Sequence, residues 1–215
     1  MKRIKNFAIS RPFLFGIVLI FLYVIFVYLT YPINFLFPEN EIGQLYSNSA
    51  IKLTISLIFL AILWIFGWTK ASGVTRFGAA RVWPVIAIIL VYHILVNLRF
   101  MTGNFTVVFP DSPLKIANLV YYFPASLMEE VMFRGLTLLA MVFAWGRTKK
   151  GLVKAVILSS LLFGLIHLFN VVELPIEVVF LEVIVAAMLG FLWAAIWLAT
   201  RSLWPAIIQI GRAHV

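Results

Sequence analysis

Long apolar segments separated by charged residues make up most of the chain. They are residues 12–38, 53–69, 82–98, 116–146, 155–172, 178–200 and 202–210. A transmembrane helix needs about 20 mostly apolar residues, and we expect each of the first six segments to cross a membrane. The seventh has nine residues, which at about 1.5 Å each cannot cross a hydrocarbon core of about 30 Å. The pattern predicts an all-α, polytopic transmembrane helix bundle with six full spans and a truncated seventh.

The first and the last apolar segments need separate interpretations. Four basic residues precede the first segment, which is too long for a cleaved signal peptide and lacks a clear small-residue cleavage site. We interpret it as an uncleaved signal anchor. Residues 211–215 do not continue an apolar helix, so we expect a truncation inside the last span or a foreign C-terminus. A short re-entrant or interfacial end is the alternative.

Composition excludes most other classes of protein. Hydrophobic residues make up 64% of the 215 residues and charged residues 12%, with a mean hydropathy of +1.07. A soluble domain, a disordered chain or a coiled coil does not have this composition. The absence of cysteine excludes disulfides, thiolate metal sites and a cysteine nucleophile. No internal repeat or linker divides the chain, and we predict a single integral-membrane domain over residues 1–215.

Charge predicts the orientation of the bundle. The net charge of +9 lies mainly before the first segment and in the loops at 70–81 and 147–154, whereas the alternate loops are weakly basic or acidic. Basic loops stay in the cytoplasm, so we predict a cytoplasmic N-terminus, a cytoplasmic loop at 147–154 and an external loop at 172–177. We expect the membrane to be a bacterial plasma membrane. Nucleic-acid binding is not expected, because no basic and aromatic module interrupts the apolar runs.

The fourth segment carries charges deep inside it. Glu129, Glu130 and Arg134 lie near its middle, where charges are costly and usually functional. Glu130 and Arg134 are four residues apart, which favours an ion pair on one helix face. Glu129 is rotated about 100° away and can face a different partner. A carboxylate in this setting is a candidate general base, and a purely structural buried ion pair is the alternative.

Other intramembrane polar residues give weaker indications. His167 lies four residues after Phe163, whose ring can pack against the imidazole, and Asn170 can share the same helix face. We expect Glu129, Arg134 and His167 to converge on one cavity between the fourth and fifth segments, because each would otherwise face lipid. Glu182 is interpreted as an acid that snorkels to the outer surface. His93 and Asn97 could bond across helices, and no chemistry is assigned to them.

Two short motifs and the approach to a third follow one another on separate segments. Residues 126–135 contain E-E-x-x-x-R with an F-R-G ending, residues 163–167 form F-x-x-x-H, and residues 202–208 look like the approach to a third motif. In this order they resemble the CAAX-protease and bacteriocin-processing (CPBP) family of intramembrane glutamic endopeptidases. The resemblance covers a core of about residues 117–210, and the earlier residues add only membrane spans.

This resemblance implies a role for each motif residue. Glu129 would be the general base that activates a water molecule, and Glu130 and Arg134 would orient and balance it. His167 would help to position the water or the substrate carbonyl. These four are the predicted catalytic residues.

The chain departs from the family at the third motif. The resemblance implies an H-x-x-x-N motif there, which supplies groups that stabilise the oxyanion. Its histidine is expected at about position 209 or 210, where Gln209 and Ile210 stand, and no asparagine follows Asn170. We therefore expect little or no peptidase activity from the chain with this C-terminus.

These observations favour an intramembrane endopeptidase, a hydrolase similar to CAAX prenyl proteases. It would cleave membrane-associated peptides or lipidated C-termini near the cytoplasmic side. A non-proteolytic bacteriocin-immunity or partner-binding protein is the alternative, and a proton-linked transporter is a third reading that lacks the usual internal repeat. No cofactor is predicted, with zinc held by glutamate and histidine as a minority alternative. The expected partners are membrane lipid and a peptide or protein substrate, with the oligomeric state left open.

Overall fold

The computed structural model describes residues 2–78, 83–84, 87, 91, 113–172 and 174–210. Every regular element in those ranges is a helix, which confirms the all-α prediction. The α-helices are α1 (Lys2–Ser10), α2 (Pro12–Thr30), α3 (Glu41–Ile65), α4 (Thr69–Ser72), α6 (Pro113–Glu130), α7 (Leu139–Trp145), α8 (Lys149–Leu165), α9 (Ile176–Thr200) and α10 (Trp204–Ile210). The 3-10 helices are η1 (Tyr31–Leu36) and η4 (Ile166–Val172), and η3 (Val131–Leu138) is a π-helix.

Four helical stretches are long and apolar enough to cross a membrane, so the chain is an integral membrane protein. They are Pro12–Leu36 (α2 with η1), Glu41–Ile65 (α3), Lys149–Val172 (α8 with η4) and Ile176–Thr200 (α9). The predicted fourth segment, residues 116–146, forms the consecutive elements α6, η3 and α7, and the short seventh forms α10. Most of the predicted third segment, residues 82–98, lies outside the described residues. The six full spans and the truncated seventh therefore remain a prediction.

The second predicted segment begins in the wrong place. We expected it at 53–69, with Lys52 at its boundary, but α3 starts at Glu41 and encloses Lys52. Asn40 caps the helix, because its side chain accepts a hydrogen bond of 2.8 Å from the backbone nitrogen of Gly43. The polar residues that follow find partners on other elements, as in the 2.6 Å hydrogen bond from the Ser47 hydroxyl to Asn34 Oδ1. Capping and tertiary contacts thus extend the helix beyond its apolar part.

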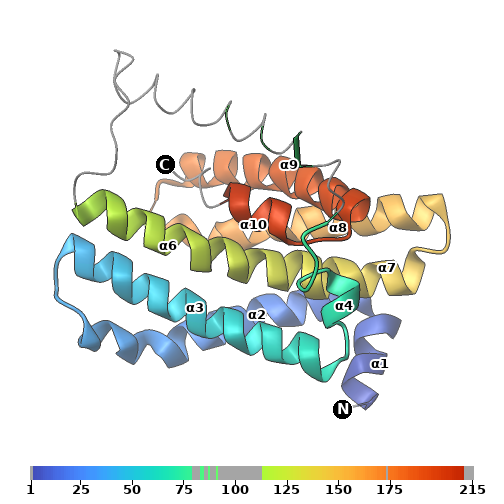
Figure 1. Ribbon diagram of the computed structural model, residues 1–215, viewed down its shortest axis with the longest axis horizontal. Coiled ribbons are helices and arrows are strands. Elements are labelled where there is room, and N and C mark those ends of the chain that lie inside the picture. The colour runs from blue at the N-terminus through green and yellow to red at the C-terminus, as the bar shows by residue number, and fades with distance from the viewer. Residues whose placement is uncertain are drawn as a thin grey trace.

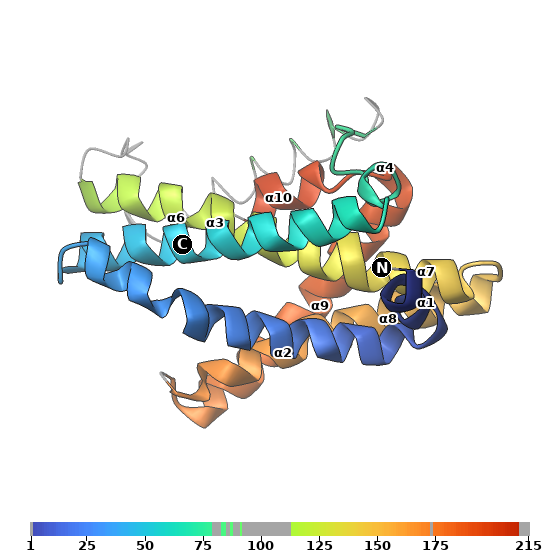
Figure 2. The ribbon, with the colours of Figure 1, turned by 90° about the horizontal axis from the view of Figure 1, so that it is seen from below.

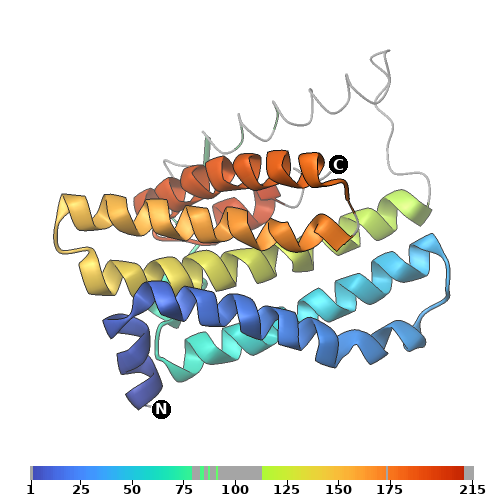
Figure 3. The same ribbon diagram turned by 180° about the vertical axis from the view of Figure 1, so that it is seen from behind.

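The line of α6, η3 and α7 runs through the middle of the bundle (Figure 1). α2 and α3 lie on one side of it and α8 and α9 on the other, as the view from behind also shows (Figure 3). α1 lies against α7 at one end of the bundle (Figure 2). Every residue of η3 is buried. The polar sequence around Glu129 therefore sits at the centre of the fold.

Two glycines let α8 and α9 pack closely. A Cβ atom on Gly164 would lie 2.7 Å from the Val183 carbonyl oxygen, and one on Gly190 would lie 3.2 Å from the Ser160 Cα. Small residues at such contacts allow helix backbones in a membrane protein to approach each other. This packing holds the end of α8, and hence η4 with His167, against α9.

Candidate active site

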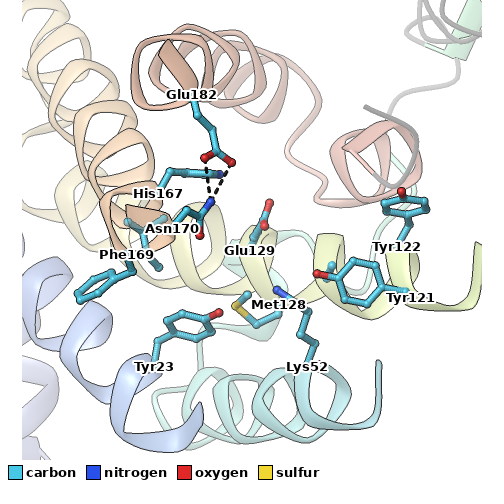
Figure 4. A pocket seen from close by; sticks show the side chains of 12 residues that line it. Tyr23, Lys52, Tyr121, Tyr122, Met128, Glu129, His167, Phe169, Asn170 and Glu182 are labelled. Atoms are coloured by element: carbon cyan, nitrogen blue, oxygen red, sulfur yellow. Dashed lines mark hydrogen bonds between the residues drawn. The ribbon is translucent and has the colours of Figure 1, made fainter. Parts of the chain in front are cut away.

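A cavity of about 270 Å³ lies between α3, α6, η4 and α9. Figure 4 shows Glu129 amid the lining side chains, with Lys52 on one side and His167 and Glu182 on the other. The lining residues are Tyr23, Lys52, Tyr121, Tyr122, Ala125, Met128, Glu129, Ile166, His167, Phe169, Asn170 and Glu182. The cavity thus combines polar groups from helices that are far apart in the sequence.

Glu129 is the carboxylate that reaches this cavity from α6. It is partly buried near the end of that helix, and its Oε2 atom is buried without a hydrogen-bond partner. A buried carboxylate oxygen without a protein partner is a site for a water molecule, because an unmet hydrogen bond is costly there. The geometry therefore gives Glu129 both a cavity and a free acceptor atom.

Glu130 faces away from the cavity and pairs with Arg134. Its Oε1 lies 2.7 Å from Arg134 Nη1, and the two side chains are 0% and 2% exposed. Arg134 Nη2 also donates a hydrogen bond of 3.2 Å to the Gly190 carbonyl oxygen. The predicted ion pair is confirmed. Arg134 is not among the cavity-lining residues, so it does not share the cavity that we expected for it with Glu129 and His167.

The π-helix η3 begins directly after the two glutamates. Its Thr137 hydroxyl donates a 3.0 Å hydrogen bond to the Met132 carbonyl oxygen, five residues earlier. π-helical turns are rare and occur frequently at functional sites. The wider turn places Arg134 and Gly135 in the buried centre of the bundle, where Gly135 leaves room for Leu63 of α3.

His167 reaches the cavity from the first turn of η4. Its Nδ1 lies 2.9 Å from the Phe163 carbonyl oxygen, which can only accept a hydrogen bond, so Nδ1 carries the proton. The Phe163 ring packs edge-on against the imidazole with ring centroids 5.4 Å apart, as predicted. The Arg134 guanidinium lies 4.4 Å from the centroid of the same ring. Phe163 therefore connects the buried ion pair to the histidine.

The prediction that Glu182 snorkels to the outer surface is wrong. Glu182 instead lines the cavity, and Asn170 Nδ2 donates hydrogen bonds of 2.9 and 2.8 Å to its two carboxylate oxygens. The close packing of α9 on α8 and η4 turns this side chain inward. The spacing of His167 and Asn170 indicated their shared face, but no local pattern connects Asn170 with a residue on the next helix.

Lys52 was missed as a site residue. It is half-buried in the middle of α3 and lines the cavity together with Glu129. Its ammonium lies 5.5 Å from the centroid of the Tyr121 ring. The sequence did contain a signal, because Lys52 is a charge next to a long apolar run. The polar residues before Lys52 hid the true start of the helix, so the sequence pattern placed the lysine at the end of a span.

Two other expectations bear on the site. Positions 209 and 210 lie at the end of α10, which packs against α6. His93 and Asn97 lie outside the described residues.

In the described part of the chain, no group of three histidine, cysteine, aspartate or glutamate side chains could hold a metal ion.

Comparison with known proteins finds a family that matches part of the chain. Residues 112–209 match the family described as type II CAAX prenyl endopeptidase Rce1-like. This confirms the resemblance derived from the motifs, and the matched segment contains Glu129, Glu130, Arg134 and His167. Comparisons with curated proteins and with solved structures find no match.

Proposed function

We propose that this chain is an intramembrane endopeptidase with Glu129 as general base. Its residues 112–209 match the Rce1-like family of type II CAAX prenyl endopeptidases. The observation that carries this proposal is the pair Glu129 and His167. They come from different helices, line one cavity, and leave a buried carboxylate oxygen free for water. The four predicted catalytic residues keep the roles that the family resemblance implies for them.

The reaction follows from these groups. A water molecule in the cavity gives a proton to Glu129, and its oxygen adds to the scissile carbonyl carbon while the carbonyl electron pair moves to oxygen. The carbonyl then re-forms, the carbon–nitrogen bond breaks, and the departing amine takes the proton from Glu129. His167 Nδ1 is occupied by the Phe163 carbonyl oxygen, so Nε2 is the ring nitrogen left to contact the water and orient it.

The buried ion pair has a positioning role in this proposal. Glu130 and Arg134 do not line the cavity, but they fix the helix turn on which Glu129 stands. Arg134 also supports Phe163, which packs on His167. Catalytic groups must be held within a fraction of an ångström of their productive positions, and this connected set of contacts provides such support.

The proposed substrates are membrane-associated peptides or lipidated C-termini, and the N-terminus of the enzyme is proposed to lie in the cytoplasm. The cavity lies among apolar helices, so a substrate whose cleavage site enters the membrane can reach Glu129. The basic loops support this orientation.

The test is hydrolysis in vesicles. The full-length protein, in a form with a complete last span, is reconstituted and supplied with a farnesylated peptide in water enriched in ¹⁸O. We expect a shortened peptide with ¹⁸O in its new carboxyl group, detected by mass spectrometry. Binding of the peptide without any cleavage would contradict the peptidase function and favour the non-proteolytic alternative. Proton flux through the vesicle wall without cleavage would favour the transporter.

A further inference from the structure

Lys52 occupies an unusual position for a lysine. It lies in the middle of α3, a helix that qualifies as a membrane span, and it faces the cavity that contains Glu129. A cation at this depth is costly and is usually paired or functional. No ion pair within 4.0 Å joins Lys52 to Glu129, although both are described and their charges attract each other. Lys52 and Glu129 thus line the same cavity without forming an ion pair with each other.

The position of Lys52 is fixed by contacts on both sides of it. Pro124 lacks a backbone N–H, which leaves the Val120 carbonyl oxygen without its helical donor. The Ser49 hydroxyl donates a 2.8 Å hydrogen bond to that oxygen, and the Ser56 hydroxyl donates one of 3.3 Å to the Pro124 carbonyl oxygen. These two bonds join α3 to α6 before and after Lys52, so the lysine is held beside Tyr121.

The proposed hydrolysis needs a hydrogen-bond donor that the other nitrogen groups of the cavity do not supply. Negative charge develops on the carbonyl oxygen as the hydroxide adds to the carbon. The Nδ1–H of His167 is already donated to the Phe163 carbonyl oxygen. The Asn170 amide donates to both carboxylate oxygens of Glu182. Lys52 has three N–H groups and a full positive charge.

We propose that Lys52 contacts the oxyanion of the transition state and stabilises it, with Tyr121 holding the ammonium in place. This inference rests on the proposed peptidase function and adds a residue outside the family-matched segment. Lys52 keeps its proton throughout: it donates a hydrogen bond as the carbonyl electrons move to oxygen, and it releases that oxygen when the carbonyl re-forms.

The kinetic test compares matched lysine variants of the full-length protein in vesicles, with a fluorescence-quenched farnesylated peptide as the probe. Lys52→Met keeps the apolar stem and removes the charge, and we expect kcat to fall on the order of a hundredfold or more with little change in KM. Lys52→Arg should retain part of the rate. Lys154→Met is the control, because Lys154 is exposed and also packs over an aromatic ring, at 4.4 Å from the Trp145 centroid. A wild-type kcat in Lys52→Met would overturn the inference.

A binding measurement separates this inference from the peptidase function. The probe is the same peptide with its scissile amide replaced by a phosphonate, a tetrahedral anion. We expect the wild-type protein and Lys154→Met to prefer the phosphonate to the amide, and Lys52→Met to lose about a hundredfold of that preference. An unchanged preference in Lys52→Met, or none in the wild type, would refute the role of Lys52 whether or not the peptide is cleaved. A preserved wild-type preference without cleavage would leave the anion site standing and refute the peptidase function alone.

The same pair of measurements distinguishes contact from positioning. If Lys52 acted only through Glu129, its removal would shift the pH profile of kcat and leave the phosphonate preference intact. That result would overturn the proposed contact with the oxyanion. Tyr121→Phe removes the hydroxyl and keeps the aromatic ring beside the ammonium, while the lysine remains. We expect it to reduce kcat by less than Lys52→Met does, and a larger loss would contradict the assignment.

Discussion

Glu129 and Glu130 are neighbours in the chain but face different surroundings. Glu129 lines the cavity, whereas Glu130 is not among the lining residues and is fully buried against Arg134 at 2.7 Å. One residue step on a helix rotates a side chain by about 100°, which is enough to separate the two carboxylates. Glu129 is therefore the candidate general base, and Glu130 is the residue that supports the fold around it.

Replacing Glu130 should mainly affect stability. Glu130→Ala leaves Arg134 buried without its ionic partner, which we expect to destabilise the protein by about 3–5 kcal/mol. Thermal or denaturant unfolding in detergent measures this change. Glu177→Ala, at an exposed position in the first turn of α9, is the matched control and should change stability by less than about 0.5 kcal/mol. Equal unfolding midpoints for the two variants would contradict the support role of Glu130.

The orientation in the membrane can be tested with single cysteines, because the native chain has none. Lys149→Cys, at the start of α8, should react with an impermeant maleimide only after the membrane is opened. Glu177→Cys, at the start of α9, should react in intact cells. The physical basis is the retention of basic loops in the cytoplasm. Labelling of position 149 from outside would reverse the proposed topology.

The close packing of α8 and α9 predicts a sensitive glycine. Gly164→Ala would place a Cβ atom 2.7 Å from the Val183 carbonyl oxygen, so the backbone of one helix must move. We expect a loss of about 1–3 kcal/mol in unfolding free energy, typical of overpacking. Leu161→Ala on the exposed face of α8 is the control and should cost less. Unchanged stability in Gly164→Ala would show that the two helices can separate freely.

The local contacts of the site could be predicted from spacing alone. Glu130 with Arg134 and Phe163 with His167 are each four residues apart, and an α-helix brings such pairs together whatever surrounds it. Both contacts are present. The all-α class followed equally directly from the long apolar runs.

The contacts between distant helices could not be predicted in this way. Lys52 lies near Tyr121 because α3 packs on α6, and Glu182 reaches Asn170 because α9 packs on η4. No periodicity in the sequence specifies which helices pack together. The start of α3 was missed for a related reason: polar residues such as Ser47 and Ser49 belong to the helix because their hydroxyls bond other elements.

Metal chelation separates the two chemical versions of the peptidase. If Glu129 activates water alone, treatment with a chelator such as EDTA should leave the cleavage rate in vesicles within about twofold of the untreated rate, because a carboxylate base needs no metal. The measurement is peptide cleavage before and after dialysis against the chelator. Loss of activity that added zinc restores would instead support the zinc alternative.

The most direct test of the account is the turnover of Glu129→Gln. Glutamine keeps the size of the side chain and removes the basic carboxylate, so packing around the cavity should change little. We expect cleavage of the farnesylated peptide to fall at least about a hundredfold while the unfolding midpoint stays at the wild-type value. Glu177→Gln, which removes an exposed carboxylate outside the cavity, should cleave at the wild-type rate. Near wild-type turnover in Glu129→Gln would contradict the central claim that Glu129 activates the water.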